Sequence, residues 1–201
     1  MSKRVELGFS WAILVLATAA SLAGLLAPGV YRDPAVLLPQ LYGQDLVTLV
    51  LGVPLLAAGM WGLARESVAG RVIWLGALGY LWYAYTTYAF GVLWNPLFLV
   101  YTALLGLTTY ALALGLAATS AGAVAARLAD RMPRRTTAGL LLATAGGFAA
   151  LWLSEEIPAA IRGAVPPSVA QMEIGTQFIH VMDLGLVLPA LGIAGWLLLR
   201  R

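Results

Sequence analysis

The chain contains no cysteine and very few charged residues. Of its 201 residues, 10% are charged and 61% are hydrophobic. The absence of cysteine excludes disulfides, thiolate metal sites and dithiol redox chemistry. Because a soluble domain usually carries about 25% charged residues, we predict that lipid, rather than water, solvates most of this chain.

Histidine and lysine are almost absent as well. His180 is the only histidine and Lys3 the only lysine, which excludes a bis-histidine haem within one chain and leaves no lysine in the spans for a retinal Schiff base. The sequence has no nucleophile elbow, zinc-protease motif, Walker loop or dinucleotide fingerprint. It also has no basic patch with interleaved aromatic residues, so we predict no nucleic-acid partner.

What the chain does contain is a series of long apolar segments. A hydrocarbon core about 30 Å thick requires roughly 20 apolar residues per helix. The first segment exceeds the usual apolar core of a signal peptide, which is about 7–15 residues long, so we interpret it as a retained span. The predicted fold is therefore all-α: a polytopic integral membrane protein forming one domain over residues 1–201, a six-transmembrane-helix bundle with spans at 8–27, 45–64, 72–90, 96–118, 137–154 and 178–199.

The basic residues predict how the chain is threaded. If the N-terminus is cytoplasmic, only Arg32 and Arg162 lie outside. This asymmetry follows the positive-inside rule. With six spans, both the N- and C-termini are cytoplasmic, and the composition is typical of a multi-pass protein of a bacterial cell inner membrane. The predicted cytoplasmic residues are Lys3, Arg4, Arg65, Arg71, Arg127, Arg131, Arg134, Arg135, Arg200 and Arg201.

Acidic residues show the opposite asymmetry. Six carboxylates, Asp33, Asp45, Glu155, Glu156, Glu173 and Asp183, fall on the predicted outer side. Ionisable groups at membrane depth are costly and point to functional sites. We therefore predict an outward-facing polar pocket on the periplasmic or extracellular side. Its predicted ligand- or proton-binding residues are His180, Asp183, Asp45, Glu155, Glu156, Asn95, Tyr83 and Tyr88.

Each of these residues also has a structural explanation. Asp45 and Asp183 fall near the first turn of a predicted helix, where the helix dipole favours a negative charge. Ser154 is a candidate cap for a short helix opening with Glu155 and Glu156, unless the fifth span continues through them. His180 is explained equally well by a bond to a loop carbonyl. The hydroxyls of the third span suit either a central helix surrounded by protein or an aromatic-lined cavity.

Two chemistries fit the predicted pocket. Carboxylates with an imidazole are ligands for a divalent metal ion, and the candidate metal ligands are His180, Asp183, Glu155 and Glu156. The same residues suit a proton relay, because an imidazole changes its protonation state near neutral pH. The spacing matches no known metal motif.

Three classes of function follow from these features. The first is a transporter or channel for a cation or small solute, with the lipid bilayer as its surroundings. The second is an accessory, sensory or assembly subunit, as part of a homo-oligomer or a larger membrane complex. The third is a membrane-embedded enzyme, metal-dependent or acid/base, acting on a lipid at the outer leaflet. The inner halves of the spans hold almost no ionisable residue to continue a path, which weighs against a transporter or channel. Spans 1–3 show no convincing repeat in spans 4–6, which weighs against a transporter of the inverted-repeat kind without excluding it.

Overall fold

The computed structural model describes residues 3–128, 132–172 and 174–200. These residues form helices, turns and loops, and no strand occurs among them. The prediction of an all-helical protein is confirmed for this part of the chain. Three of the charged residues used above, Arg131, Glu173 and Arg201, lie outside the described residues.

The chain divides into two compact units, Met1–Ala129 and Asp130–Arg201. Each unit is described by itself. Whether the whole chain behaves as one domain stays a prediction.

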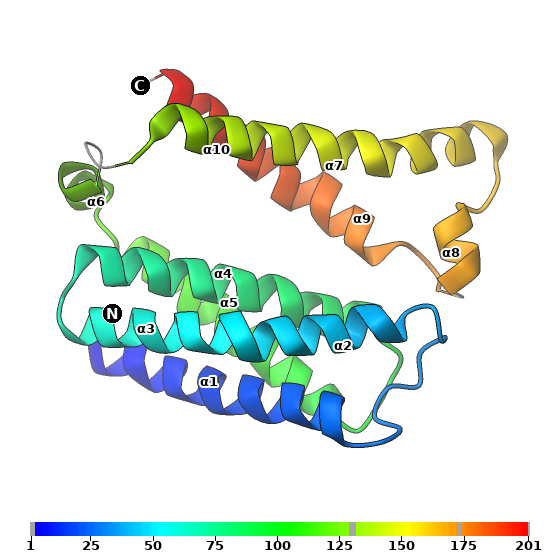
Figure 1. Cartoon of the computed structure of the whole chain (residues 1–201), viewed down its shortest axis with the longest axis horizontal. Coiled ribbons are helices and arrows are strands. Elements are labelled where there is room, and N and C mark those ends of the chain that lie inside the picture. Colours follow the sequence, from blue (N-terminus) through cyan, green and yellow to red (C-terminus); the bar gives the residue numbers. More distant parts are fainter. Residues whose placement is uncertain (1–2, 129–131, 173, 201) are drawn as a thin grey trace. The chain divides into compact units, whose positions relative to one another are not determined.

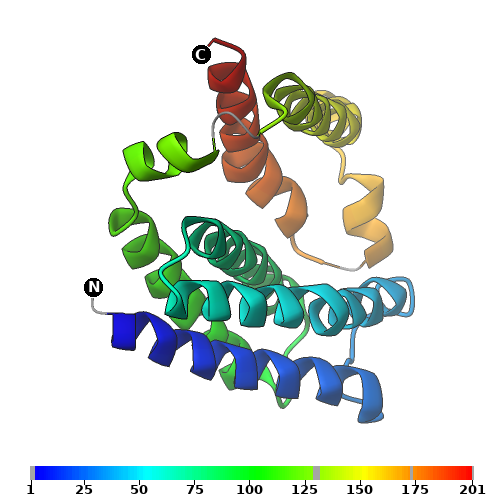
Figure 2. The ribbon, with the colours of Figure 1, turned by 60° about the vertical axis from the view of Figure 1, so that its left-hand side comes forward.

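The first unit is built around four long helical segments. The segments are α1 (Lys3–Leu26), a second made of α2 (Leu38–Val47), the π-helical turn η1 (Thr48–Gly52) and α3 (Val53–Ala64), then α4 (Val68–Gly91) and α5 (Phe98–Ala117). Helix α1 packs on α3 and α5, and α4 packs on the other sides of the same two helices. In both views these helices lie side by side as one bundle (Figures 1 and 2). A short helix, α6 (Ala121–Leu128), follows and contacts α4.

Glycine brings α3 and α4 close together. A Cβ on Gly59 would lie 2.5 Å from the Cα of Trp74, and a Cβ on Gly62 would lie 2.5 Å from the Cα of Gly70. In lipid, small residues at helix contacts allow the close packing that holds spans together. The Ser67 side chain accepts a hydrogen bond from the backbone N–H of Gly70 at 3.2 Å and caps the start of α4.

Helix α4 is the buried centre of the first unit. Trp74, Leu78 and Leu81 are fully buried, and the Tyr85 and Tyr88 side chains are nearly so. The polar atoms of α4 are bonded to its neighbours: the Trp74 indole N–H donates to Ser10 at 2.7 Å, and the Tyr85 hydroxyl donates to the Ala17 carbonyl at 3.3 Å. Of the two interpretations of the third span, this burial favours the central helix.

The second unit is a helical hairpin closed by a long connection. It consists of α7 (Arg134–Arg162), α8 (Pro167–Met172) and a broken segment made of α9 (Phe178–Met182), the π-helical turn η3 (Asp183–Val187) and α10 (Leu188–Arg200). Helices α7 and α10 pack on each other along one end of the hairpin (Figure 1). There the Arg134 guanidinium donates to the Leu198 carbonyl at 3.3 Å, and a Cβ on Gly195 would lie 2.9 Å from Leu142.

The lengths of the helices and their exposed apolar side chains indicate a membrane protein. Among the described residues, five helical segments are long and apolar enough to cross a membrane: 3–26, 38–64, 98–117, 134–162 and 178–200. Helix α4 is equally long, with 24 residues, but its four tyrosines lower its hydropathy. Large apolar side chains such as Val15, Leu99 and Leu140 are exposed on these segments, as expected for surfaces that face lipid.

Two predicted helix boundaries are wrong, and they change the meaning of the carboxylates. The second segment begins at Leu38 rather than at residue 45, so Asp45 lies two turns inside it. Helix α7 continues to Arg162, so Glu155 and Glu156 lie within a helix and Ser154 is not its N-cap. The helix-capping explanations for Asp45 and for the Glu155–Glu156 pair are thereby contradicted.

Candidate functional site

Glu156 and His180 form a hydrogen-bonded pair in the second unit. Helix α7 supplies Glu156 and α9 supplies His180, and the His180 Nδ1 lies 2.7 Å from the Glu156 Oε1. Because an ionised carboxylate only accepts hydrogen bonds, the Nδ1–H is the donor. The His180 residue is 4% exposed and the Glu156 side chain 32%. The pair therefore combines a buried imidazole with a carboxylate that solvent reaches.

Trp152 connects this pair to Asp183. Its ring stacks on the His180 ring with the centroids 4.3 Å apart, and its indole N–H donates to the Asp183 Oδ2 at 2.9 Å. Trp152 lies one helical turn before Glu156, so both side chains point to the same side of α7. The Trp152 ring therefore contacts one face of the His180 ring, and the Glu156 carboxylate contacts the edge of the His180 ring.

Glu155 is not part of this arrangement. Its carboxylate accepts a hydrogen bond from the backbone N–H of Ser168 at 2.6 Å. Ser168 lies in α8, in the connection between α7 and α9. Consecutive residues of a helix point about 100° apart, which explains why adjacent glutamates serve different purposes. Glu155 holds the connection, while Glu156 faces His180.

A cavity of about 700 Å³ adjoins the Glu156–His180 pair. This volume lies within the range of about 300–1,000 Å³ that is usual for small-molecule sites. Its polar side chains are Glu156, His180, Thr176 and Gln177, and the rest of its wall is mostly apolar. The apolar wall is formed by Ala164, Val165, Pro166, Val169, Val181 and Leu184, with Gly175 and Gly185.

The charges around this cavity favour a cation. Glu156 and His180 line it, and Asp183 comes directly before Leu184 and Gly185, which also line it. Glu156 is therefore the acidic side chain that the wall presents to a ligand, whereas Asp183 is buried and bonded to Trp152. We refer to this cavity with Glu156, His180, Trp152 and Asp183 as the α7–α9 site.

The predicted metal site has no geometric counterpart in the described residues. No group of three histidine, aspartate or glutamate side chains in this part of the chain is arranged to hold a metal ion. Glu155 is directed to Ser168, while Asp183 accepts from Trp152 and Glu156 accepts from His180. A divalent metal ion therefore stays a prediction that the contacts do not support.

Asp45 belongs to the first unit, where two tyrosines hold it. The Tyr31 hydroxyl donates to one carboxylate oxygen at 2.5 Å, and the Tyr88 hydroxyl lies 3.0 Å from the other. Asp45 is 2% exposed. The Tyr88 ring also stacks on Tyr31 and on Tyr101. This predicted site residue is thus enclosed by aromatic rings.

Asn95, another predicted site residue of the first unit, takes part in a turn through its side chain. The Asn95 carbonyl oxygen accepts from the Leu97 backbone N–H at 2.9 Å, and its amide donates to the Leu93 carbonyl at 3.2 Å. Asn95 therefore stabilises the turn between α4 and α5. Tyr83 is half-buried on α4.

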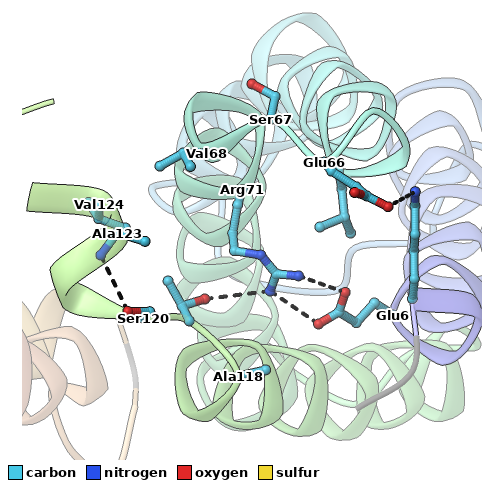
Figure 3. Close-up of a pocket in the computed structure, with 12 residues that line it drawn as sticks. Glu6, Glu66, Ser67, Val68, Arg71, Ala118, Ser120, Ala123 and Val124 are labelled. Carbon is cyan, nitrogen blue, oxygen red and sulfur yellow. Dashed lines mark hydrogen bonds and ion pairs between the residues drawn. The ribbon is translucent and has the colours of Figure 1, made fainter. Parts of the chain in front are cut away.

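A second cavity, of about 340 Å³, lies in the first unit where α1, α3, α4, α5 and α6 meet. Figure 3 shows the Arg71 guanidinium between Glu6 and the α5–α6 corner. The Arg71 Nη1 and Nη2 donate to the two Glu6 oxygens at 3.1 and 3.0 Å, and Glu6 is 1% exposed. Nearby, Lys3 lies 3.3 Å from Glu66 at the surface. Two acids compensate two bases, so this cavity has no net charge with which to attract an ion.

Three features of these clusters were not predicted from the sequence. Trp152 was not among the predicted site residues, although its indole N–H bonds to Asp183. Tyr31 was unassigned, and the pairing of Glu6 with Arg71 spans 65 residues. The one available signal was the placement of Trp152 one helical turn before Glu156. Comparison of the chain with models of protein families, with curated proteins and with solved structures finds no match.

Proposed function

We propose that the protein is a six-span membrane transporter, with both termini in the cytoplasm, that takes up a small organic cation through the α7–α9 site. The observation that carries the proposal is the cavity beside the Glu156–His180 pair, which is lined by apolar side chains and by the Glu156 carboxylate. The proposal has two parts, the threading of the chain and the ligand of the cavity.

The proposal adds α4, the third span in chain order, to the five segments that hydropathy identifies. A helix of 24 residues is about 36 Å long, which exceeds the hydrocarbon thickness of about 30 Å. Its low hydropathy comes from tyrosines and tryptophans that bond to neighbouring helices, as Trp74 does to Ser10 and Tyr85 to Ala17. A polar group that is satisfied inside the bundle is not exposed to lipid. The hydropathy of α4 therefore does not argue against a crossing.

Arginine–tryptophan pairs support the ends of two proposed spans. The Arg65 guanidinium lies 3.8 Å from the centre of the Trp61 ring, and the Arg200 guanidinium lies 3.7 Å from that of Trp196. Arginine and tryptophan pairs at helix ends are typical of the membrane interface. Both pairs lie at the ends of helices that, in the proposed topology, run from outside to inside.

Single cysteines test the topology, because the chain has none of its own. Leu93, in the turn after α4, and Glu66, in the turn before it, are both exposed. In intact cells, a membrane-impermeant maleimide is expected to label Leu93→Cys, but to label Glu66→Cys only after permeabilisation. If α4 does not cross the membrane, the two positions react from the same side.

The ligand class follows from the wall of the cavity. A carboxylate in an apolar surrounding attracts a cation more strongly than it does in water, and the apolar wall offers contacts to carbon atoms that a bare metal ion does not use. A small organic cation satisfies both features. An accessory subunit requires no such cavity, and an enzyme acting on lipid requires one that opens to the acyl chains.

Uptake into proteoliposomes tests the transport activity. Choline is a suitable probe because its charge is permanent, so it does not cross the bilayer as a neutral base. We expect saturable uptake of radiolabelled choline that excess unlabelled choline abolishes and that 3,3-dimethyl-1-butanol, its uncharged analogue, leaves unchanged. Uptake equal to that of protein-free liposomes would overturn the proposed transport.

A further inference from the structure

The first helix of each unit carries a similar sequence. Residues 14–26 read LVLATAASLAGLL, and residues 140–152 read LLLATAGGFAALW. With residue 14 aligned to residue 140, seven of the thirteen positions are identical, including Thr18 and Thr144. Both segments lie in the helix that opens its unit, α1 or α7. Both helices are followed by a long proline-containing connection.

The second segment of each unit shares a pattern of rarer residues. In each, an aspartate comes just before or begins a π-helical turn: Asp45 precedes Thr48–Gly52, and Asp183 begins Asp183–Val187. Fewer than about 1% of residues in soluble proteins are in π-helices, and they often mark functional sites. A proline follows the turn, a tryptophan lies seven residues after the proline, and an arginine lies four residues after the tryptophan. These residues are Pro54, Trp61 and Arg65 in the first unit and Pro189, Trp196 and Arg200 in the second.

The two segments also pack on their first helices in the same way. In the first unit the start of α1 meets the end of α3, where Lys3 contacts Glu66, and the end of α1 meets α2, where Gly24 contacts Asp45. In the second unit Arg134 at the start of α7 contacts Leu198 near the end of α10. Towards its other end, α7 contacts Asp183 through Trp152. Each aspartate therefore packs against the distal part of the helix that opens its unit.

We infer that residues 14–65 and 140–200 are two copies of one helical hairpin, and that only the second copy retains an open ligand site. The repeat lies between spans 1–2 and spans 5–6, with α4 and α5 inserted between the copies. The first part of the inference depends on sequence and packing alone. The second part rests on the proposed function, because it assigns the ligand site to the α7–α9 site.

The copies differ in what surrounds the aspartate. Around Asp45, the Tyr31 and Tyr88 side chains supply both hydrogen-bond donors and the rings that enclose the carboxylate. Around Asp183, a tryptophan N–H is a donor, and the next residues line a cavity of about 700 Å³. Tyrosines enclose the carboxylate in the first copy, whereas in the second copy the buried carboxylate is followed in the chain by residues that line a cavity. We therefore assign a structural role to Asp45 and a positioning role in ligand binding to Asp183.

If both hairpins have the same orientation in the membrane, the chain between them must cross the membrane an even number of times. In the proposed topology α4 and α5 supply these crossings, so the connections of both hairpins face the same side of the membrane. Val36 lies exposed in the first connection and Ala170 in the second. In intact cells, an impermeant maleimide is expected to label Val36→Cys and Ala170→Cys alike. Labelling from opposite sides would show that the hairpins are inverted and overturn the repeat as proposed.

The same substitution at Asp45 and at Asp183 tests whether the first aspartate is structural and the second positions the ligand site. In lipid nanodiscs, Asp183→Asn is expected to weaken choline binding about tenfold, because the neutral amide oxygen accepts a weaker hydrogen bond from the Trp152 ring that positions His180. Asp45→Asn is expected to change choline binding by less than about twofold and to lower the unfolding temperature more than Asp183→Asn does. The carboxylate-retaining Asp183→Glu separates positioning from folding, and we expect it to restore part of the affinity.

The outcomes separate this inference from the proposed transport. Equal effects of Asp45→Asn and Asp183→Asn on both readouts would overturn the division of roles. A protein that binds choline with these effects but does not transport it would leave the inference standing and overturn the transport. A wild-type protein that binds no choline would overturn the ligand site of the second copy, while the cysteine labelling decides the repeat independently.

Discussion

Arg71 donates to both oxygens of the Glu6 carboxylate, in a cavity where Glu6 is almost fully buried. The pair links α4 to α1, and a weaker contact at 3.5 Å links Arg71 to Thr119 after α5. A charge taken out of water is stable only while its partner is present. The ion pair therefore links the ends of α1 and α4 to the residue that follows α5.

Removing one member of this pair is expected to destabilise the protein. Glu6→Gln leaves the Arg71 charge without its carboxylate, at a cost of about 3 kcal/mol in the free energy of unfolding. The exposed pair Lys3–Glu66 is the control, and Glu66→Gln is expected to cost less than about 1 kcal/mol. Denaturation followed by tryptophan fluorescence measures both variants. Equal losses would show that burial of the Glu6–Arg71 pair has no energetic consequence.

The packing of α1 on Asp45 leads to a second prediction. A Cβ on Gly24 would overlap Asp45 and the Tyr31 hydroxyl, whereas nothing lies within 4 Å of a Cβ on Gly8 of the same helix. Gly24→Ala is expected to lower the free energy of unfolding by about 1–3 kcal/mol through overpacking. Gly8→Ala is expected to raise it slightly, because alanine favours the helix by about 1 kcal/mol. Thermal unfolding in one detergent compares the two, and a loss for Gly8→Ala as large as that for Gly24→Ala would contradict the packing.

Tyr31 makes stability depend on alkaline pH. Burial raises the pKa of its hydroxyl far above the usual range, and its contacts with Tyr88 and Asp45 act in the same direction. A group with a raised folded-state pKa stabilises the protein fully below its unfolded pKa, which for tyrosine is about 10. That contribution decreases as pH rises further, because the unfolded state releases the proton first. We expect the unfolding temperature to fall above pH about 10, and to fall less steeply in Tyr31→Phe; identical slopes would contradict this role.

Trp152 and Asp183 are expected to act as one unit in choline binding. Trp152→Phe keeps a ring against His180 but removes the N–H that bonds to Asp183. Because both variants weaken or remove the same contact, the effect of Trp152→Phe with Asp183→Asn should be smaller than the sum of the single effects. Choline affinities of the four proteins complete the double-mutant cycle. Strict additivity would show that the hydrogen bond does not position His180.

Helices were predictable from the sequence where apolar runs are long. All six predicted segments are helical, because about 20 consecutive apolar residues leave the backbone few alternatives in lipid. The two mispredicted helix boundaries fall in stretches that contain several polar residues. Residues 38–44 contain Pro39, Gln40 and Gln44, and the Glu155–Glu156 pair precedes Pro158, so both stretches resemble loops. The helix continues in each case because the polar side chains find partners, as Gln44 does at the Tyr80 hydroxyl and Glu155 at Ser168.

The candidate site was predictable only in part. The proximity of His180 and Asp183 follows from their spacing of three residues on a helix, but the choice of Glu156 over Glu155 depends on the rotation of α7. Such rotations are decided by packing between segments distant in sequence. Asp45 was expected beside His180 because both fall at the same membrane level. The structure places Asp45 among the tyrosines of the first unit, and these contacts depend on packing between segments distant in sequence.

The most direct test of the central claim compares two adjacent glutamates. Only Glu156 lines the cavity, whereas Glu155 bonds to the backbone of Ser168, and the two substitutions to glutamine change charge identically. Equilibrium binding of choline to protein in nanodiscs should show a Kd raised about tenfold or more in Glu156→Gln and unchanged within about twofold in Glu155→Gln. Equal affinities in the two variants would contradict the assignment of the α7–α9 site.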